Sequence, residues 1–358
     1  MPQPANPEPL APPGARGGRV RLTLADPDRM WAAVALDTHL AVPLPRSYTT
    51  VPGGWELSFP LPPLDRLEYG VRLTTAEGIT ETVPDPGNPR RAGGSFGDRS
   101  WLPLRLSDGS LYAEPVWLGA KSVAHHLEHW GLAETPIGDL AAHVWSPASA
   151  DPRDDLPMLL VHDGPELDRF GRLTQWVGSQ IAVGQLPPLR VVLLEPGDRD
   201  VRYSANDAYA DVLAEAVGVL RQRWPSSSHP VLIGASLGGL AALQAARRHR
   251  GTFAGLWLAS GSFFTPRTDP EERAYRFFDR IAAFTADVAA DPPDEVAITM
   301  VCGAAEENLT NNRLLRDRLR ARGLEVGWGT VRDGHNTTCW RDLFEPHLGD
   351  LLRRAWGC

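Results

Sequence analysis

Apolar and polar residues alternate over short segments in the first third of the chain, and turn residues separate these segments. The alternation is clearest at residues 19–24, 55–59 and 69–73. Such alternation is typical of strands with one buried face, and short strands at this spacing favour an antiparallel sandwich. We therefore predict an N-terminal, immunoglobulin-like β-sandwich over residues 19–105, preceded by a disordered Pro- and Gly-rich tail at residues 1–18.

The pattern changes at about residue 137, where continuous apolar runs begin to alternate with segments of helical periodicity. Continuous runs are typical of strands buried on both faces, and their alternation with helices predicts a mostly parallel, doubly wound α/β sheet. We assign residues 106–136 to a connecting segment and residues 137–358 to an α/β domain. The predicted strands are 140–145, 157–162, 189–194, 231–233, 253–259, 296–301 and 326–331, and the clearest helices are 207–223, 240–248 and 311–322.

The sequence Gly234-Ala235-Ser236-Leu237-Gly238 lies between a predicted buried strand and a predicted helix. Strand, sharp turn and helix form the context in which G-x-S-x-G is a nucleophile elbow of the α/β-hydrolase fold. The glycines leave room around an exposed serine hydroxyl, so we predict Ser236 as a nucleophile. The N–H of Leu237, at the start of the helix, is then one oxyanion donor.

A serine nucleophile needs a base, and the base needs an acid that orients it. In this fold the chain order is serine, acid, histidine. His335 follows the last predicted strand in a tight turn and is our candidate base. Glu306 follows the strand before it and is our candidate acid, with its neighbour Glu307 as the alternative.

The second oxyanion donor is expected in the loop after an earlier strand, at His162-Asp163-Gly164-Pro165-Glu166. Proline has no N–H. Gly164 or Glu166 must therefore donate, and we favour Gly164.

Taken together, these residues resemble the enterochelin esterases, a branch of the esterase D-like α/β-hydrolases. The resemblance covers roughly residues 20–352. The matching motifs are the DP-x-NP loop at 85–89, the pair Asp163-Gly164, the elbow with Gly239 and Leu240, Gly303 with Glu306, and Gly334-His335 followed by Cys339-Trp340-Arg341.

The resemblance implies hydrolysis of the esters that join catechol-acyl serine units in an iron-carrying siderophore. Such a substrate is anionic when iron is bound, so Arg199, Arg202 and Arg341 are expected contacts, and Trp340 is expected to stack on catechol rings. The family usually has glutamate where this chain has Arg202, and often proline where it has Glu307. These departures leave two alternatives open: a serine esterase or acyltransferase for another ester, such as an acylated sugar or a secondary metabolite, and a non-catalytic siderophore-binding protein.

Composition narrows the possible partners. The formal net charge of −8 argues against a sequence-independent nucleic-acid binder, and no apolar run is long enough to span a membrane. His125, His126 and His129 are close in sequence, but no further ligands accompany them, so we predict no metal site and no cofactor. With no signal-peptide pattern, we expect a cytoplasmic enzyme whose partner is a small-molecule ester. The oligomeric state is left open.

Overall fold

The structure is a computed structural model that describes residues 10–95, 97–106, 108–294 and 296–357. These residues form two compact units. The first contains the residues up to Ala113 together with Arg332–Asn336, and the second contains Glu114–Val331 together with the residues from Thr337 onward. A short piece from near the C-terminal end therefore belongs to the same unit as the N-terminal strands.

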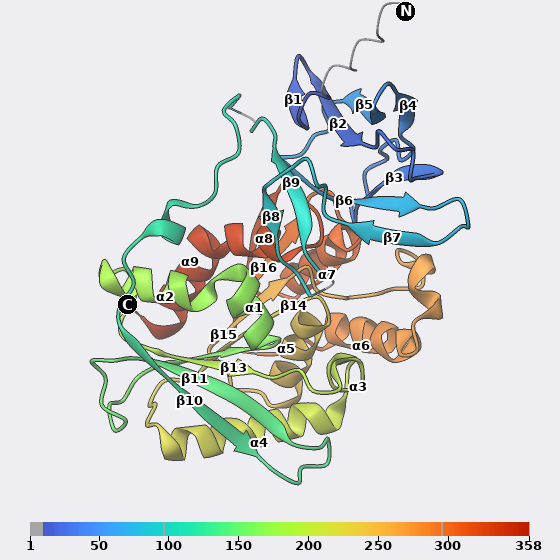
Figure 1. Cartoon of the computed structure of the whole chain (residues 1–358). Helices are drawn as coiled ribbons and strands as arrows, with labels where there is room; N and C mark the ends of the chain where they lie inside the picture. The colour runs from blue at the N-terminus through green and yellow to red at the C-terminus, as the bar shows by residue number, and fades with distance from the viewer. Residues whose placement is uncertain (1–9, 96, 107, 295, 358) are drawn as a thin grey trace, which may run out of the picture. The chain divides into compact units, whose positions relative to one another are not determined.

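The first unit consists of two antiparallel sheets, with the order β1-β2-β5-β4 in one and β3-β6-β9-β8 in the other, where β7 also pairs with β6 (Figure 1). Alternate residues such as Val20 and Leu22 of β2, and Phe59 of β5, are buried, as the sequence pattern predicts. The strands are β1 (Gly14–Arg16), β2 (Arg19–Ala25), β3 (Ala33–Asp37), β4 (Thr49–Val51), β5 (Gly54–Pro60), β6 (Arg66–Thr74), β7 (Thr80–Val83), β8 (Arg91–Ala92) and β9 (Arg99–Pro103).

The prediction of a disordered tail at residues 1–18 is wrong for Gly14–Arg16. Gly14–Arg16 forms β1 and pairs antiparallel with β2. Backbone hydrogen bonds thus order a segment that has no alternation of apolar and polar residues. Residues 1–9 of that prediction lie outside the described residues.

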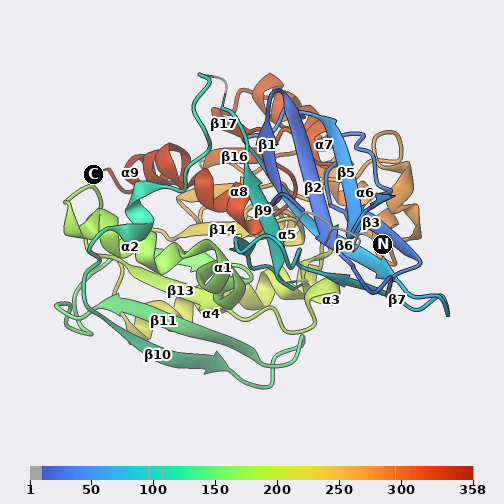
Figure 2. The same cartoon turned by 45° about the horizontal axis from the view of Figure 1, so that its top comes forward.

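The second unit is built on an eight-stranded sheet with the order β10-β11-β13-β12-β14-β15-β16-β17 (Figure 2). The strands from β13 onward along this order run parallel, and β10 and β11 are antiparallel to their neighbours. The fold is therefore the mixed α/β architecture predicted from the sequence. The strands are β10 (His125–Leu132), β11 (Leu140–Pro147), β12 (Met158–Val161), β13 (Arg190–Leu194), β14 (Val231–Ala235), β15 (Gly255–Ala259), β16 (Ala297–Gly303) and β17 (Val326–Val331).

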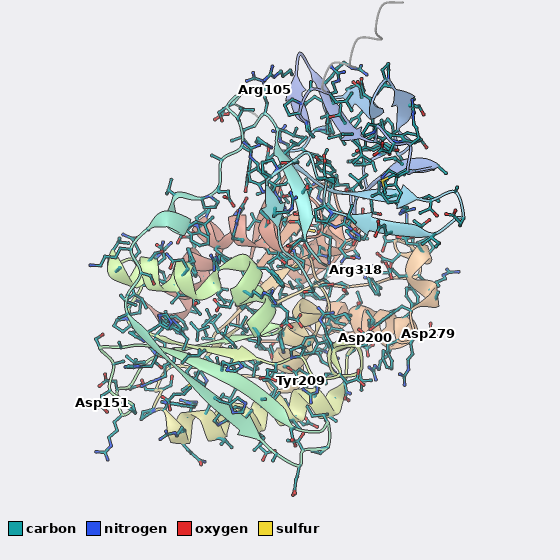
Figure 3. The ribbon with its side chains drawn as sticks, viewed as in Figure 1. Arg105, Asp151, Asp200, Tyr209, Asp279 and Arg318 are labelled. Carbon is teal, nitrogen blue, oxygen red and sulfur yellow. The ribbon has the colours of Figure 1, made fainter. Side chains whose placement is uncertain are left out.

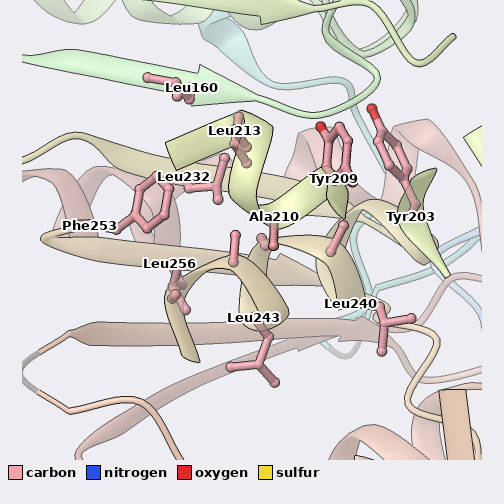
Figure 4. Packing of buried hydrophobic residues seen from close by; sticks show 14 of the residues in the cluster. Leu160, Tyr203, Tyr209, Ala210, Leu213, Leu232, Leu240, Leu243, Phe253 and Leu256 are labelled. Carbon is pink, nitrogen blue, oxygen red and sulfur yellow. The ribbon is translucent and has the colours of Figure 1, made fainter. Parts of the chain in front are cut away.

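Helices cover both faces of this sheet, and each face has its own core. Along β12, Met158 and Leu160 pack into one core while Leu159 and Val161 pack into the other, as the alternation of side chains along a strand requires. Figure 4 shows the first core, where Leu213, Leu232 and other apolar side chains meet. The helices are α1 (Gly164–Gly171), α2 (Leu173–Ala182), α3 (Arg199–Tyr203), α4 (Asp207–Arg223), α5 (Leu237–Arg248), α6 (Phe278–Ala290), α7 (Leu309–Ala321), α8 (Thr337–Asp342) and α9 (Gly349–Trp356), with short helical turns η1 (Val116–Gly119), η2 (Pro270–Ala274) and η3 (Phe344–Leu348).

The interpretation of residues 106–136 as a connecting segment is wrong for His125–Leu132. These residues form β10, the edge strand of the large sheet, paired with β11 along its whole length. Among the described residues, none of the helices combines the length and the apolar character that a bilayer span needs.

Candidate active site

The G-x-S-x-G motif forms the sharp turn between β14 and α5. Ser236 has φ 55° and ψ −124°, a conformation of positive φ that residues with a side chain rarely adopt. A Cβ on Gly234 would lie 2.4 Å from the carbonyl carbon of Gly238, and one on Gly238 would lie 3.1 Å from the Cβ of His162. Space therefore requires glycine at position 234 and leaves little room for a side chain at position 238. The turn presents a half-buried Ser236 at the carboxyl end of β14.

The loop after β12 leads into α1 through a second tight turn. Asp163 has the left-handed conformation φ 49°, ψ 39°, and Gly164 is the first helical residue. A Cβ on Gly164 would lie 2.3 Å from the Cα of Leu193, so only glycine fits against β13 here. Gly164 and Leu237 each stand first in a helix, where a backbone N–H has no intrahelical acceptor. Both residues thus carry donors suited to an anion, after neighbouring strands of one sheet.

Arg199, the first residue of α3, forms a bidentate ion pair with Asp163. Its Nε donates to Oδ1 and its Nη2 donates to Oδ2, both at 2.8 Å. Burial alone lowers the pKa of Arg199, but the Asp163 carboxylate outweighs this effect and raises the pKa above its usual value. The guanidinium therefore fixes the Asp163 side chain beside Gly164, and its expected contact with substrate stays a prediction.

The guanidinium of Arg202 is bound by backbone carbonyls of the protein itself. The residue is 5% exposed, and its side chain donates to the backbone carbonyls of Ile137, Asp139 and Pro196 at 3.1, 2.7 and 3.4 Å. The residue connects α3 to the segment that precedes β11, and its expected contact with substrate stays a prediction.

The two candidate acids lie in different surroundings on the loop between β16 and α7. Glu306 is 4% exposed, and its Oε1 accepts a hydrogen bond from the Cys302 thiol at 2.5 Å, whereas Glu307 is exposed. Burial, together with the nearby Glu306 carboxylate, raises the pKa of the Cys302 thiol, so the thiol stays protonated and keeps its donor role. A buried carboxylate held by a donor suits the orientation of a base, so these surroundings favour Glu306.

The loop after β15 contacts Ser236 directly. The Ser236 N–H donates to the carbonyl of Ala259 at 2.8 Å, and the hydroxyl oxygens of Ser236 and Ser262 lie 3.2 Å apart. The buried Asn312 of α7 holds this loop, because its side chain donates to the Gly261 carbonyl at 2.7 Å and accepts from the Gly261 N–H at 3.1 Å. Ser262 is a neighbour of the candidate nucleophile that sequence reasoning missed; its only signal was its position after a buried strand.

His335 lies in the loop Arg332–Asn336, which follows β17 and leads into α8. This loop groups with the first unit. A Cβ on Gly334 would lie 2.7 Å from Cδ2 of Leu40, so a side chain next to the candidate base would require the Leu40 side chain to move. The position after the last strand of the sheet is the one predicted for the base.

The helix α8 carries the two remaining predicted substrate contacts. Arg341 is 6% exposed and engages two carboxylates: its Nε donates to Asp342 at 2.8 Å and its Nη1 donates to Glu114 at 2.9 Å. Trp340 is half-buried, and its indole N–H donates to the hydroxyl of Ser260 at 2.9 Å. The role of either residue toward a substrate stays a prediction.

His162, directly before Asp163, is fully buried against two tyrosines that Figure 4 labels. Its ring centre lies 4.8 Å from that of Tyr203 and 5.6 Å from that of Tyr209. Burial lowers the pKa of His162 to about 3, and the charge of Arg199 acts in the same direction. His162 is therefore a neutral core residue beneath the elbow and not a second candidate base.

The three histidines considered as metal ligands lie along β10. His125 and His129 occupy one face of this strand and His126 the other, since side chains alternate. Within the described part of the chain, no group of three His, Cys, Asp or Glu residues is placed to hold a metal ion.

A model of the family described as "Putative esterase" matches residues 137–351, more than half of the chain. The chain belongs to this esterase family. The matched region contains the elbow, both candidate oxyanion donors, both candidate acids and His335. Membership supports a carboxylic ester hydrolase.

Solved structures of similar fold extend over both units. The enterobactin esterase from Shigella flexneri, crystallised in the presence of enterobactin, is 19% identical, with a TM-score of 0.71 over 95% of this chain and 93% of its own. The ferric enterobactin esterase from Salmonella typhimurium is 19% identical, with a TM-score of 0.73 over 97% of this chain and 96% of its own. A ferulic acid esterase is 16% identical, with a TM-score of 0.54 over 64% of this chain and 99% of its own. No curated protein matches the chain. The resemblance to the enterochelin esterases is thus confirmed in the fold.

Proposed function

We propose that this esterase is a serine hydrolase in which Ser236 is the nucleophile, His335 the base and Glu306 the acid that orients the base. The observation that carries the proposal is the strained conformation of Ser236, with φ 55° and ψ −124°, at a turn where Gly234 leaves no room for a side chain. A strained serine at a strand-to-helix turn is the device by which this fold exposes its nucleophile. The order serine, acid, histidine along the chain, after β14, β16 and β17, supports the same assignment.

The reaction proceeds by two acyl transfers. His335 removes the proton from Ser236 as the serine oxygen attacks the ester carbonyl, and the N–H groups of Leu237 and Gly164 stabilise the oxyanion. Collapse of the intermediate breaks the ester bond, and His335 returns the proton to the leaving alcohol. Water, deprotonated by His335, then attacks the acyl-enzyme and releases the acid. Glu306 stabilises the imidazolium in both steps, and the chemistry requires no cofactor.

For the substrate, we propose an ester of a catecholate siderophore, with iron as the cargo that hydrolysis frees. Support comes from the enterobactin esterases that share the fold over nearly the whole chain, one of them crystallised in the presence of enterobactin. Trp340, half-buried on α8, offers an aromatic face for stacking. The roles in iron release and in the cytoplasm, expected from the sequence, stay predictions.

A second candidate substrate is an aromatic ester that carries no anionic iron complex. Three arginines expected to bind the anion are engaged by acceptors of the protein itself: Arg199 by Asp163, Arg202 by backbone carbonyls, and Arg341 by Asp342 and Glu114. The ferulic acid esterase, whose fold is similar over 64% of this chain, is named for such an ester.

Product analysis by mass spectrometry tests both candidates. Ferric enterobactin, iron-free enterobactin, methyl ferulate and p-nitrophenyl butyrate are incubated separately with wild-type protein and with Ser236→Ala. The control is Ser227→Ala, an exposed serine between α4 and β14. We expect Ser236→Ala to lower hydrolysis by at least about 10³-fold, and Ser227→Ala to leave it unchanged.

The outcomes separate the hypotheses. Serine-dependent release of linear catecholoyl-serine fragments supports the siderophore ester, whereas serine-dependent cleavage of the ferulate alone supports the second candidate. A fluorophosphonate probe that fails to label Ser236 in folded protein would contradict both and favour a non-catalytic binder.

A further inference from the structure

The loop that carries His335 is held by residues of the N-terminal strands, all within the first unit. The N–H of Asp65, just before β6, donates to the carbonyl of Arg332 at 2.8 Å, and the Arg332 Nε returns a hydrogen bond of 2.8 Å to the Asp65 carboxylate. The Arg332 Nη2 also donates to the carbonyl of Arg105 at 2.7 Å (Arg105 is labelled in Figure 3). The start of the loop is therefore fixed from the N-terminal side of the chain.

Arg66, the first residue of β6, holds the loop on both sides of the histidine. Its Nε donates to the carboxylate of Asp333 at 2.6 Å, and its Nη2 donates to the side-chain oxygen of Asn336 at 2.7 Å and to Glu68 at 2.6 Å. Asp333 and Asn336 flank His335 at two residues before it and one residue after it. A single guanidinium thus spans the turn whose middle carries the proposed base.

The Asp333 carboxylate also accepts hydrogen bonds from within the loop. The second oxygen of Asp333 accepts from the N–H of Gly334 at 2.7 Å and from the side-chain amide of Asn336 at 2.9 Å. The N–H of Asn336 donates to the Gly334 carbonyl at 3.0 Å. Because Asp333 binds both the turn and Arg66, the conformation of the turn depends on where Arg66 holds this carboxylate.

The burial of this network is costly, which indicates a role beyond filling space. Arg66 is 1% exposed and Asp333 is 3% exposed. Burial by itself lowers the pKa of Arg66, but Asp333 and Glu68 outweigh it and keep the guanidinium charged. A buried ion pair is weak evidence for stability, because apolar residues of similar volume often serve as well, so its best-attested use is to specify one arrangement.

We propose that Arg66 is a positioning residue for His335: its buried guanidinium, on the N-terminal sheets, sets the conformation of the histidine loop around the proposed base. The proposal rests on the proposed function, in which His335 is the base. It assigns the N-terminal unit a part in the chemistry of the esterase through Asp333 and Asn336.

The test uses Arg66→Lys in the full-length protein. Lysine keeps the charge but cannot donate from two fixed nitrogens to acceptors on both sides of the turn. We expect kcat on p-nitrophenyl butyrate to fall by about 10²-fold, the loss typical of a small misplacement of a catalytic group, with KM changed less than about twofold. We expect the rate of fluorophosphonate labelling of Ser236 to fall in parallel, and hydrogen exchange to rise in the peptide that contains residues 332–336.

The matched control is Arg72→Lys. Arg72 lies on the same strand and pairs with Asp37 at 2.9 Å, but it is half exposed and binds no residue of the histidine loop. We expect it to leave kcat, labelling and exchange unchanged. If Arg66→Lys does not fold, Asn336→Ala replaces it, since this variant leaves the Arg66–Asp333 pair in place, and we expect a loss in kcat of about tenfold.

A folded Arg66→Lys or Asn336→Ala enzyme with wild-type kcat would overturn the positioning role. His335→Ala, measured alongside, tells this failure from failure of the proposed function. If His335→Ala is inactive while Arg66→Lys is fully active, only the positioning role is wrong. If folded His335→Ala keeps its activity, the catalytic assignment of His335 is wrong as well.

Discussion

Single residues in this protein are distinguished by their surroundings more than by their type, and Glu306 and Glu307 are the clearest pair. Glu306 is buried and accepts a hydrogen bond from Cys302, whereas its neighbour is exposed. We expect Glu306→Gln to lower kcat on p-nitrophenyl butyrate by about 10³-fold, because the base loses the charge that orients and stabilises it. Glu307→Gln serves as the matched control and is expected to stay within twofold. The reverse ranking of the two variants would move the acid to Glu307.

His162 makes the stability of the second unit depend on pH. Its pKa is lowered to about 3 in the folded protein, because burial disfavours the charged ring. In the unfolded chain the ring takes up a proton near pH 6.5, so the unfolded state binds more protons between these two values. The contribution of neutral His162 to the free energy of unfolding is therefore fully present above about pH 6.5 and is lost as the pH falls toward 3.

We expect His162→Leu to weaken this pH dependence. Over pH 6 to 4 its free energy of unfolding should fall less steeply than that of wild type, by up to about 1.4 kcal/mol per pH unit. Urea unfolding at pH 7, 6, 5 and 4 measures both slopes. Parallel slopes for the two proteins would show that His162 takes up its proton in the folded state as easily as in the unfolded chain.

At the scale of elements, the start of α1 depends on a partner from α3. Arg199 binds Asp163 through two parallel hydrogen bonds and so holds the turn that leads into Gly164. We expect Arg199→Lys to lower kcat by about tenfold with little change in KM, since a lysine makes a single-point contact and leaves the oxyanion donor less well placed.

Arg248→Lys is the control for this variant. Arg248 also binds an aspartate, Asp211, through two nitrogens, but it does so at the far end of α5 from the elbow. Steady-state kinetics on p-nitrophenyl butyrate compare the two. Equal effects of both variants would show that Arg199 contributes only to general stability.

The sequence predicts those elements that bury a periodic pattern. The helix α4 spans Asp207–Arg223, the bounds expected from its apolar spacing, and a strand forms at every predicted apolar run of the α/β region. The edge strand β10 escaped prediction because His125–Leu132 is mostly exposed and has no apolar alternation. It is a strand because its backbone pairs with β11.

In the candidate site too, some residues have a local signal in the sequence and others have none. The elbow, with Ser236 and its glycines, is a local signal, which the sequence shows as G-x-S-x-G between an apolar run and a helical segment. Arg66 and Asp333 are 267 positions apart in the chain, and nothing in the sequence around either residue indicates the other. The sequence does not reveal the hydrogen bonds from Arg202 to backbone carbonyls, because an arginine that binds carbonyls has the same local pattern as one that binds an anion.

At the scale of the whole molecule, the α/β unit has its own cores, whereas the loop Arg332–Asn336 depends on the N-terminal strands. Both apolar cores of the large sheet are built from residues after Glu114. We expect a chain that begins at Glu114 to fold, as followed by circular dichroism, but to react with a fluorophosphonate at least about 10²-fold more slowly, since its histidine loop lacks Asp65 and Arg66. Labelling at the full-length rate would show that the loop needs no support from the N-terminal sheets.

The first unit combines N-terminal strands with residues from near the C-terminal end, and this affects when it can form during synthesis on the ribosome. The N-terminal strands emerge first, and Asp333 is made 267 residues after Arg66. At about 5–20 residues per second, this delay is roughly 15–50 s. The first unit therefore cannot reach its final form during early synthesis. Until the large sheet has been made, the Arg66 guanidinium has Glu68 as a partner but lacks Asp333 and Asn336. For the same reason, an exchange of the N-terminal strands alone keeps this ion pair only if the exchanged segment supplies an arginine at position 66.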